Sequence, residues 1–482
     1  MKKRFFIGII FIGFLSMAFN LYDYTCIILP ENQLNYEKIE FPLDVLNNLS
    51  EMDNMPEENP TTDDGALLGR VLFYDVDLSK NNTISCASCH IQKYSFADTA
   101  QFSKGFSGKL GTRNSMGLIH ARFQKDSSFF WDNRATTLEI QTLMPIQDPI
   151  EMGLNLDTLL ERVSSKSFYP TLFKNAFGSE NITTERISRA LAQFIRSMNT
   201  FGSKFRQGVN ITKGNPSITP FSNFTEQENL GKELFMDEFR GNCQACHTRN
   251  IMVQGGAQNI GLDLVYKDNG QGALTGKPNS VQNGKFSVPS LINVELTAPY
   301  MHDGRFKTLE EVINFYSDSI KNHVNLSGFL REIQPGNTDP NHVFCDTCPP
   351  RKPHFTNKEK AALVAFLKTL TDTLITNDQR WSNPFCRNEI NGINEINPIF
   401  TLNIFPNPID CGTTNLNINS ESAFESEVII NNLSGKLVFK SKYNFTIGQN
   451  TIDIKNELVS GIYLVSILDK NKNKITKKLI VK

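Results

Sequence analysis

The sequence predicts a mainly α-helical protein built from two tandem domains of the same kind and followed by a small all-β tail. The first supporting observation is an internal duplication: "LGRVLFYD" (68–75) and "WDNRATTLE" (131–139) return in the same order as "LGKELFMD" (230–237) and "HDGRFKTLE" (302–310). The second is a change near Thr401, after which apolar and polar residues alternate between Gly/Asn turns to the end of the chain.

The N-terminus predicts export. Three cations precede an apolar run from Phe5 to Phe19, which is the layout of a signal peptide and is short for a membrane span. We therefore expect a signal peptide over residues 1–20, with an uncleaved anchor as the alternative. Cys26 lacks a lipobox before it, so no lipid anchor is expected. The mature protein is expected to be water-soluble and to act between the periplasm and the cell surface or the medium.

The length of the chain indicates the number of domains, and its charge balance bears on the class of partner. A chain of 482 residues is expected to fold as two to four domains. It carries 49 Lys and Arg against 50 Asp and Glu, so its composition gives no indication of a nucleic-acid partner.

Each half is predicted to be helical. Thr225 and Glu228 form a capping-box pattern that begins a helix. "ALAQFIRSM" (190–198) and "ALVAFLKTL" (362–370) predict the helix that closes each half. The apolar residues of the first closing helix recur on one face: Ile187, Leu191, Phe194 and Met198. The Gly- and Asn-rich stretch 258–284 is expected to be a loop.

Two short clusters, "CASCH" (86–90) and "CQACH" (243–247), carry the chemistry. C-x-x-C-H is the attachment sequence of c-type haem, in which two thiols add to the porphyrin vinyl groups and the histidine ligates the iron. A zinc site would need further ligands nearby, and a redox C-x-x-C pair would not need the histidine. The sequence therefore predicts two covalently bound haem c groups, held by Cys86, Cys89 and His90 and by Cys243, Cys246 and His247.

These clusters set the expected domains. We expect class-I-like cytochrome c domains over residues 37–215 and 220–385, because each range contains one cluster and one copy of the repeat. The tail, residues 401–482, is expected to be a small β-sandwich. It contains no His, Met or Trp and so offers none of the usual haem ligands.

The tail motifs "FPNP", "NLSGKLV" and "GIYLV" occur in this order before a basic C-terminus. In these it resembles the sorting domain of the type IX secretion system. The resemblance implies that the type IX secretion machinery is a partner. An adhesive or carbohydrate-binding β-module is the alternative.

From about Asn59 to Asp372 the chain resembles the bacterial dihaem cytochrome c peroxidases and the related MauG enzymes. The resemblance is carried by the two haem clusters and by "GTRNSMGL", "FFWDNR", "PIQDPIEMG" and "VPSLINVELTAPYMHDGRFKTLEEV". It implies a peroxidatic first haem and an electron-transferring second haem.

Many members of this family have a histidine before the "RN" motif that caps the first iron in the resting state. Here the equivalent position is about Phe106, and no histidine occurs between His90 and His120. The resemblance therefore implies a first haem with an open position that needs no reductive activation. We interpret His120, which follows the "RN" motif, as a surface or structural residue.

The resemblance also implies roles for residues near the first haem. Glu151, in "DPIEMG", matches the distal acid–base residue that moves the proton of bound hydrogen peroxide. Gln141 matches a second distal residue, and Pro145 matches a residue that lines the same pocket. Trp131 occupies the position of the tryptophan between the haems, where it would relay electrons.

For the second haem, the candidate iron ligands near the "HDGR" motif are Met301, His302 and Tyr316. The peroxidases have a methionine fourteen residues beyond the motif's histidine, whereas MauG has a tyrosine there. In this chain that position is Tyr316. A phenolate ligand favours Fe(III), whereas methionine favours Fe(II) and raises the potential. A tyrosine that only packs is the alternative.

Asn114, Thr297 and Pro299 match the family's calcium site between the domains, so the resemblance implies one Ca²⁺.

Four cysteines remain outside the haem clusters and Cys26. Cys345 and Cys348 form "CDTC", and we expect a disulfide between them or to Cys386 because the chain is exported. Cys411 lies in the tail, and its pairing is left open.

Together these features predict a secreted dihaem cytochrome c peroxidase. It would reduce hydrogen peroxide to water with electrons from a small donor protein, either a cytochrome c or a cupredoxin. The alternatives are a MauG-like oxidase that uses high-valent haems on a protein or aromatic substrate, and a surface electron-transfer cytochrome without catalysis. The family resemblance also implies a homodimer.

Overall fold

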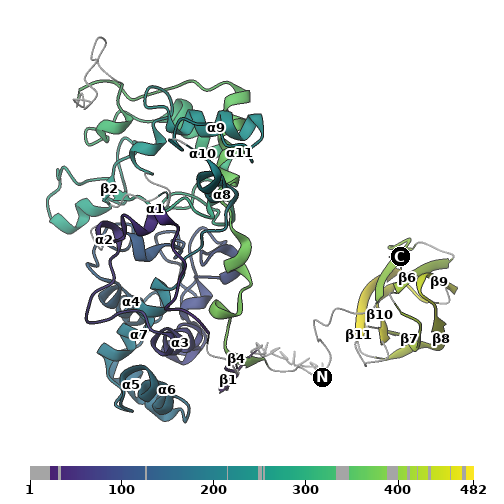
Figure 1. Cartoon of the computed structure of the whole chain (residues 1–482). Helices are drawn as coiled ribbons and strands as arrows, with labels where there is room; N and C mark the ends of the chain where they lie inside the picture. The colour runs from purple at the N-terminus through teal and green to yellow at the C-terminus, as the bar shows by residue number, and fades with distance from the viewer. Residues whose placement is uncertain are drawn as a thin grey trace, which may run out of the picture. The chain divides into compact units, whose positions relative to one another are not determined.

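The computed structural model describes residues 22–30, 34–124, 128–213, 215–247, 252, 256–332, 347–387, 400–409, 413–420, 422–432, 436–455, 458–468 and 474–481. The predicted signal peptide, residues 1–20, lies outside them. The chain divides into two compact units, Tyr24–Cys386 and Met1–Asp23 with Arg387–Lys482 (Figure 1). No helix in the described part of the chain is long and apolar enough to cross a membrane.

The first half of the Tyr24–Cys386 unit is helical, as predicted (Figure 1). Its helices are α1 (Leu43–Leu46), α2 (Leu49–Met52), α3 (Asp63–Tyr74), α4 (Leu138–Gln147), α5 (Leu156–Ser165), α6 (Tyr169–Phe177), α7 (Thr184–Arg196) and α8 (Lys204–Ile211). The stripe of Ile187, Leu191 and Phe194 on α7 is fully buried, together with Met198 just beyond it.

The second half repeats the principal helix pair of the first. Its helices are α9 (Glu226–Met236), α10 (Leu309–Asn314) and α11 (Asn357–Lys368), and α9 packs on α11 as α3 packs on α7. Thr225 and Glu228 form the predicted capping box, with a bond of 2.7 Å from the Thr225 N–H to the Glu228 carboxylate.

In both halves the duplicated sequence forms a pair of helices that cross closely at a glycine. A methyl group at Gly69 of α3 would overlap the Ala190 carbonyl of α7, and one at Gly231 of α9 would overlap the Ala362 carbonyl of α11. Glycine at these two equivalent positions lets the helix backbones approach this closely. The internal repeat in the sequence is therefore also a repeat in packing.

The segment after α11 runs back along the first half (Figure 1). Residues of α3 hold its backbone: Arg70 Nε donates to the Ser382 carbonyl at 2.6 Å, and the Tyr74 hydroxyl donates to the Trp381 carbonyl at 2.6 Å. The segment ends in β4 (Phe385–Arg387), which pairs with β1 (Tyr22–Ile27).

A disulfide joins Cys26 of β1 to Cys386 of β4. The expected alternative that Cys386 pairs with the "CDTC" segment is therefore wrong, because Cys386 is bonded 360 residues away in sequence. Cys348 is disulfide-bonded. Cys345 and Cys411 lie outside the described residues.

The C-terminal region is all-β, as predicted. Its strands are β5 (Phe400–Phe405), β6 (Thr413–Ser420), β7 (Phe424–Asn432), β8 (Leu437–Phe445), β9 (Gly448–Lys455), β10 (Gly461–Leu468) and β11 (Lys474–Val481). They form two antiparallel sheets, in the orders β11-β10-β7-β8 and β5-β6-β9. Residues of both sheets share one buried apolar core, which includes Leu416, Val428, Ile430, Val465 and Leu479.

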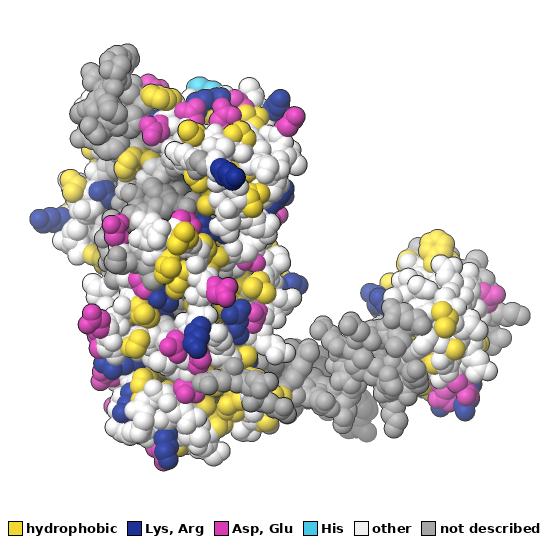
Figure 2. Space-filling model, in the orientation of Figure 1, with side chains coloured by type: hydrophobic (Ala, Val, Ile, Leu, Met, Phe, Trp, Pro, Cys, Tyr) yellow, Lys and Arg dark blue, Asp and Glu magenta, His cyan; other side chains and the backbone are white. Residues whose placement is uncertain are grey.

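The visible surface carries charges of both signs. Figure 2 shows Lys and Arg interspersed with Asp and Glu over the face in view, as the balanced composition leads us to expect.

Candidate functional site

The first haem-attachment motif lies in a cavity of about 530 Å³. Cys86–Ser88 form a single 3₁₀ turn, and the His90 N–H donates to the Cys86 carbonyl at 3.0 Å. The second motif makes the same turn, with a bond of 2.9 Å from the His247 N–H to the Cys243 carbonyl. The turn places both thiols and the imidazole of each motif on the wall of one cavity.

His90 is prepared to act as a ligand. Its Nδ1 lies 3.0 Å from the Phe96 carbonyl, which fixes Nδ1 as the protonated nitrogen and leaves Nε2 free for a metal. Burial lowers the pKa of His90, so the ring is neutral. Burial lowers the pKa of His247 to about 4, against the opposing effect of hydrogen bonds to the backbone of Met252 and Pro289.

The four thiols of the motifs are unpaired and partly buried. Burial raises the pKa to about 12 for Cys86, Cys243 and Cys246 and to about 11 for Cys89. The described residues contain no cluster of three His, Cys, Asp or Glu that could hold a metal ion. Neutral thiols beside a neutral imidazole in an apolar cavity fit covalent haem, because thioether formation removes their polar S–H groups.

The expected distal residues lie in the same first cavity. Gln141 and Pro145 are one turn apart on α4, so they share a face, and Glu151 follows in the turn after the helix. Asp148 fixes this turn, since its Oδ1 accepts the N–H groups of Ile150 at 2.7 Å and of Glu151 at 3.2 Å. Burial, and then the Asp148 carboxylate, raise the pKa of Glu151, and Arg134 opposes them.

Phe106 stands where a capping histidine would be and is not among the residues that line the cavity. Its ring packs against Gly153, where a methyl group would overlap it, and its N–H donates to the Glu151 carbonyl at 2.9 Å. This position therefore supports the backbone of the Glu151 turn.

His120 lines the first cavity but is engaged elsewhere. It is 2% exposed, its Nε2 lies 2.9 Å from the Thr200 carbonyl, and its ring stacks on Phe201. Of the two interpretations from the sequence, surface is wrong and structural is the one that the contacts support.

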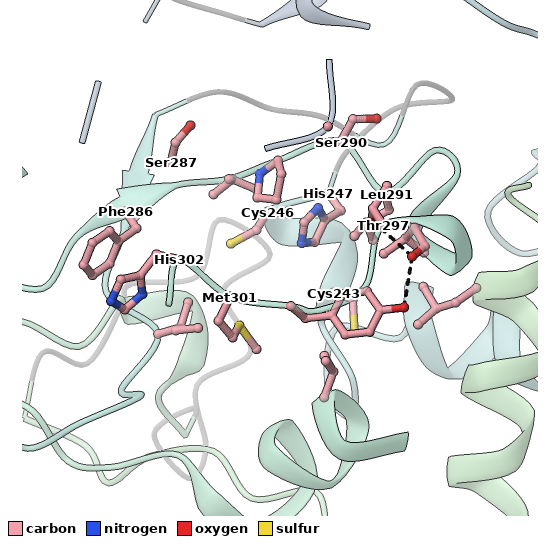
Figure 3. A pocket seen from close by; sticks show the side chains of 18 of the residues that line it. Cys243, Cys246, His247, Phe286, Ser287, Ser290, Leu291, Thr297, Met301 and His302 are labelled. Carbon is pink, nitrogen blue, oxygen red and sulfur yellow. Dashed lines mark hydrogen bonds between the residues drawn. The ribbon is translucent and has the colours of Figure 1, made fainter. Parts of the chain in front are cut away.

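The second cavity, of about 230 Å³, contains Cys243, Cys246 and His247 (Figure 3). Met301 and His302, two of the expected alternative ligands, also line it. His302 is buried and stacks on Phe286, with ring centroids 3.6 Å apart and ring planes within 12° (Figure 3).

Tyr316, the third expected ligand, lines this cavity as well. It continues the cavity-facing stripe of α10, which consists of Leu309, Val312 and Ile313. It lies in a single π-helical turn, Phe315–Ser319, and such turns occur frequently at functional sites. Burial raises its pKa above that of an ordinary tyrosine. No hydrogen bond from a described residue reaches its hydroxyl.

Trp131 lines both cavities, as its expected place between the haems requires. Its indole N–H donates to the Asn114 carbonyl at 2.8 Å, and its ring centroid lies 6.5 Å from that of His302. Asn114, Thr297 and Pro299, the expected calcium residues, all line the second cavity, and Asn114 comes from the first half. Calcium itself stays a prediction.

Sequence reasoning missed the charged residues beside Trp131. Arg113 pairs with Asp132 at 2.6 Å and with Asp268 at 2.7 Å, so it links the two halves. The available signal was their position, because Arg113 precedes Asn114 and Asp132 follows Trp131 inside the quoted motifs. Asp268 carried no such signal, since it lies in a Gly/Asn-rich loop.

Comparison with family models gives two matches. The model of the di-haem cytochrome c peroxidases matches residues 63–213 and 225–381. The model of the secretion system C-terminal sorting domain matches residues 403–482.

Named relatives come from both branches of the first family. The methylamine utilization protein MauG of Methylophilus methylotrophus is 30% identical over 284 residues, which cover 59% of this chain and 81% of that protein. The cytochrome c551 peroxidase of Nitrosomonas europaea is 34% identical over 257 residues, or 53% of this chain and 73% of that protein. Among solved structures, a MauG-like protein associated with microbial copper homeostasis is 30% identical, with a TM-score of 0.60 over 72% of this chain and 99% of that one.

Proposed function

Because this chain belongs to the di-haem cytochrome c peroxidase family, we propose a division of labour between its two cavities, with peroxide reacting in the first and electrons arriving through the second. The protein is a peroxidase that carries two c-type haems and reduces hydrogen peroxide to water. Its C-terminal domain is a type IX sorting domain, so it is exported. The finer assignments below are proposals.

The observation that supports peroxide chemistry in the first cavity is its combination of His90 and Glu151. Besides His90, His120 is the other histidine among the described residues that line this cavity, and its Nε2 is held by Thr200. His90 would therefore hold the first haem, and no second histidine among these described residues is free to cap its iron against peroxide. When bound, this haem supplies the iron that coordinates peroxide and passes electrons to it.

The chain supplies the proton transfers. Glu151, ionised, takes the proton from one oxygen of hydrogen peroxide and returns it to the leaving oxygen, while Gln141 offers hydrogen bonds beside it. With two electrons and two protons, the O–O bond breaks and two waters form. Pro145 keeps this part of the wall apolar.

We assign the second cavity to electron entry, with Trp131 as the relay between the cavities. The donor is a small redox protein, either a cytochrome c or a cupredoxin. His247 and Tyr316 are the residues that would hold the iron of the second haem, because His302 is stacked on Phe286 and the Tyr316 hydroxyl has no other partner among the described residues. A tyrosine there also favours the second candidate function, a MauG-like oxidase.

Three further assignments complete the proposal. The haem domains are residues 37–215 and 220–385, each of class-I cytochrome c type, and the tail of residues 401–482 is a β-sandwich, supported by the shared core of its two sheets. One Ca²⁺ is held by Asn114, Thr297 and Pro299, whose amide and carbonyl oxygens suit a hard cation. A homodimer follows from the family resemblance.

The test of the proposed function is peroxide reduction by the fully oxidised protein as purified, with a reduced small cytochrome or cupredoxin as donor. Turnover should begin without a lag and without prior partial reduction, since no histidine from residues 91–119 has to leave the first iron. A requirement for reductive activation would contradict the open first site, and absence of peroxide turnover would refute the function.

We also propose that a signal peptide over residues 1–20 leads the protein into the periplasm and that the tail then carries it to the cell surface or the medium. A chain that ends at Arg387 should remain in the periplasm with unchanged peroxidase activity, because the Tyr24–Cys386 unit keeps its own contacts. The measurement is activity in periplasmic, surface and medium fractions. Export of the shortened chain to the medium would contradict the proposal.

A further inference from the structure

The long loop Gln258–Gly284 is built around Asp268. Asp268 Oδ1 accepts the Gly270 N–H at 2.8 Å, and the Gln271 N–H donates to the Lys285 carbonyl at 2.9 Å. Gly270 has φ = 54°, and a methyl group there would overlap the Lys285 carbonyl. These constraints give Asp268 a defined position, although the composition of the segment is that of a loop.

Asp268 reaches across to Arg113 of the first half. The guanidinium makes two parallel bonds to it, from Nε to Oδ2 at 2.7 Å and from Nη2 to Oδ1 at 2.9 Å. The third nitrogen, Nη1, pairs with Asp132 Oδ2 of the first half at 2.6 Å. Asp132 is 4% exposed, whereas the side chains of Arg113 and Asp268 are 18% and 28% exposed, so the clamp is partly shielded from water. The fork of Arg matches two carboxylates in a way that a lysine ammonium does not.

The clamp lies where the two cavities meet. Arg113 lines the first cavity, and its guanidinium lies 5.9 Å from the ring centroid of Phe286, which lines the second and stacks on His302. The next residue, Asn114, accepts the Trp131 indole N–H through its carbonyl and donates its own N–H to the His302 carbonyl at 2.7 Å.

We propose that Arg113 is a positioning residue for electron passage between the two haem sites. By clamping Asp132 and Asp268, it holds the halves in the register in which Trp131 contacts both cavities. This inference rests on the relay role assigned to Trp131 under the proposed function.

The test is the rate at which an electron redistributes between the two haems of the holoenzyme after flash reduction, followed by absorbance. Arg113→Gln should slow it by up to about 10-fold, because loss of the clamp lets the halves shift and misplaces Trp131 relative to the two sites. Asp268→Asn should slow it comparably, and the double variant should be no slower than Arg113→Gln alone. The EPR signal of each ferric haem should stay as in the unaltered protein.

Arg305→Gln is the matched control. Arg305 also sits between two aspartates, Asp263 and Asp303, but all three belong to the second half. Wild-type redistribution in Arg305→Gln with slowing in Arg113→Gln supports the proposal, whereas an unchanged rate in Arg113→Gln or equal slowing in both overturns it.

Asp268→Asn and Trp131→Phe separate the alternatives. If Arg113→Gln does not load haem, Asp268→Asn decides, because asparagine keeps the size and shape of the aspartate side chain and removes only its charge; a wild-type rate there overturns the clamp. If Trp131→Phe slows redistribution and the clamp variants do not, the positioning role of Arg113 is refuted and the relay role of Trp131 is supported. A wild-type rate in Trp131→Phe refutes the relay and, with it, the clamp.

Discussion

Replacing Glu151 by Gln is expected to lower the turnover of hydrogen peroxide by about 10²- to 10⁴-fold, which is the usual contribution of a positioned acid–base group. The amide keeps the size and some hydrogen bonding of the carboxylate but neither accepts nor returns the peroxide proton. Covalent haem content and the spectra of both haems should not change, because Glu151 belongs to neither haem-attachment motif and is not a proposed iron ligand. The measurement is steady-state kcat and kcat/KM for peroxide with a reduced donor.

The dependence of peroxide turnover on pH tests whether Glu151 is the acid–base group. The base must be ionised to take the proton, so activity should fall as pH falls through its pKa. Burial and the Asp148 carboxylate raise that pKa, so the acid limb should lie above the ordinary glutamate range. In Glu151→Gln the residual activity should lack this limb. Glu161→Gln, on the exposed face of α5, is the control and should behave as wild type. Full activity in Glu151→Gln would remove Glu151 from the mechanism.

Tyr316→Met is expected to raise the midpoint potential of the second haem by on the order of 100 mV or more, since methionine favours Fe(II) and a phenolate favours Fe(III). The substitution would convert the second site to the ligand type of the family's peroxidases. The EPR signal of the second ferric haem should change with it, while that of the first should not. The measurement is a spectroelectrochemical titration of both haems.

The second cavity offers a control for this experiment. Tyr300 also lines it, but its hydroxyl already donates to the Val294 carbonyl at 3.1 Å. Tyr300→Phe should therefore leave the potential near its wild-type value. An unchanged potential and spectrum in Tyr316→Met would show that Tyr316 only packs, and Met301 would become the ligand to test.

The sequence predicted the features that depend on residues close together in the chain. Each C-x-x-C-H motif is a single turn, so its two thiols and imidazole reach one cavity whatever the remaining fold. The repeat of "LG" before each motif predicted two equivalent halves. Gly69 and Gly231 lie at the same helix crossing in each half, because α7 and α11, on which their helices pack, are also repeats of one another. The all-β tail followed from period-two alternation, which needs no knowledge of distant partners.

Contacts between segments that are far apart in the chain could not be predicted from the sequence. Nothing near Cys26 indicates Cys386 as its partner, because pairing depends on the path of the segment after α11 along the first half. The ion pair between Arg113 and Asp268 depends in the same way on where a long loop folds back. The spacing from His302 found Tyr316, but the π-turn that contains it was not predicted, because such turns are rare interruptions of the regular helical period.

The central claim is that the first iron, over His90, has an open position that binds peroxide while the second is closed. Low-temperature EPR of the fully oxidised protein, before and after one equivalent of hydrogen peroxide, tests it most directly. The account predicts one high-spin and one low-spin ferric signal, with the high-spin signal lost on adding peroxide. Two low-spin signals that peroxide leaves unchanged would contradict it, because both irons would then be capped and the protein would carry electrons without reducing peroxide.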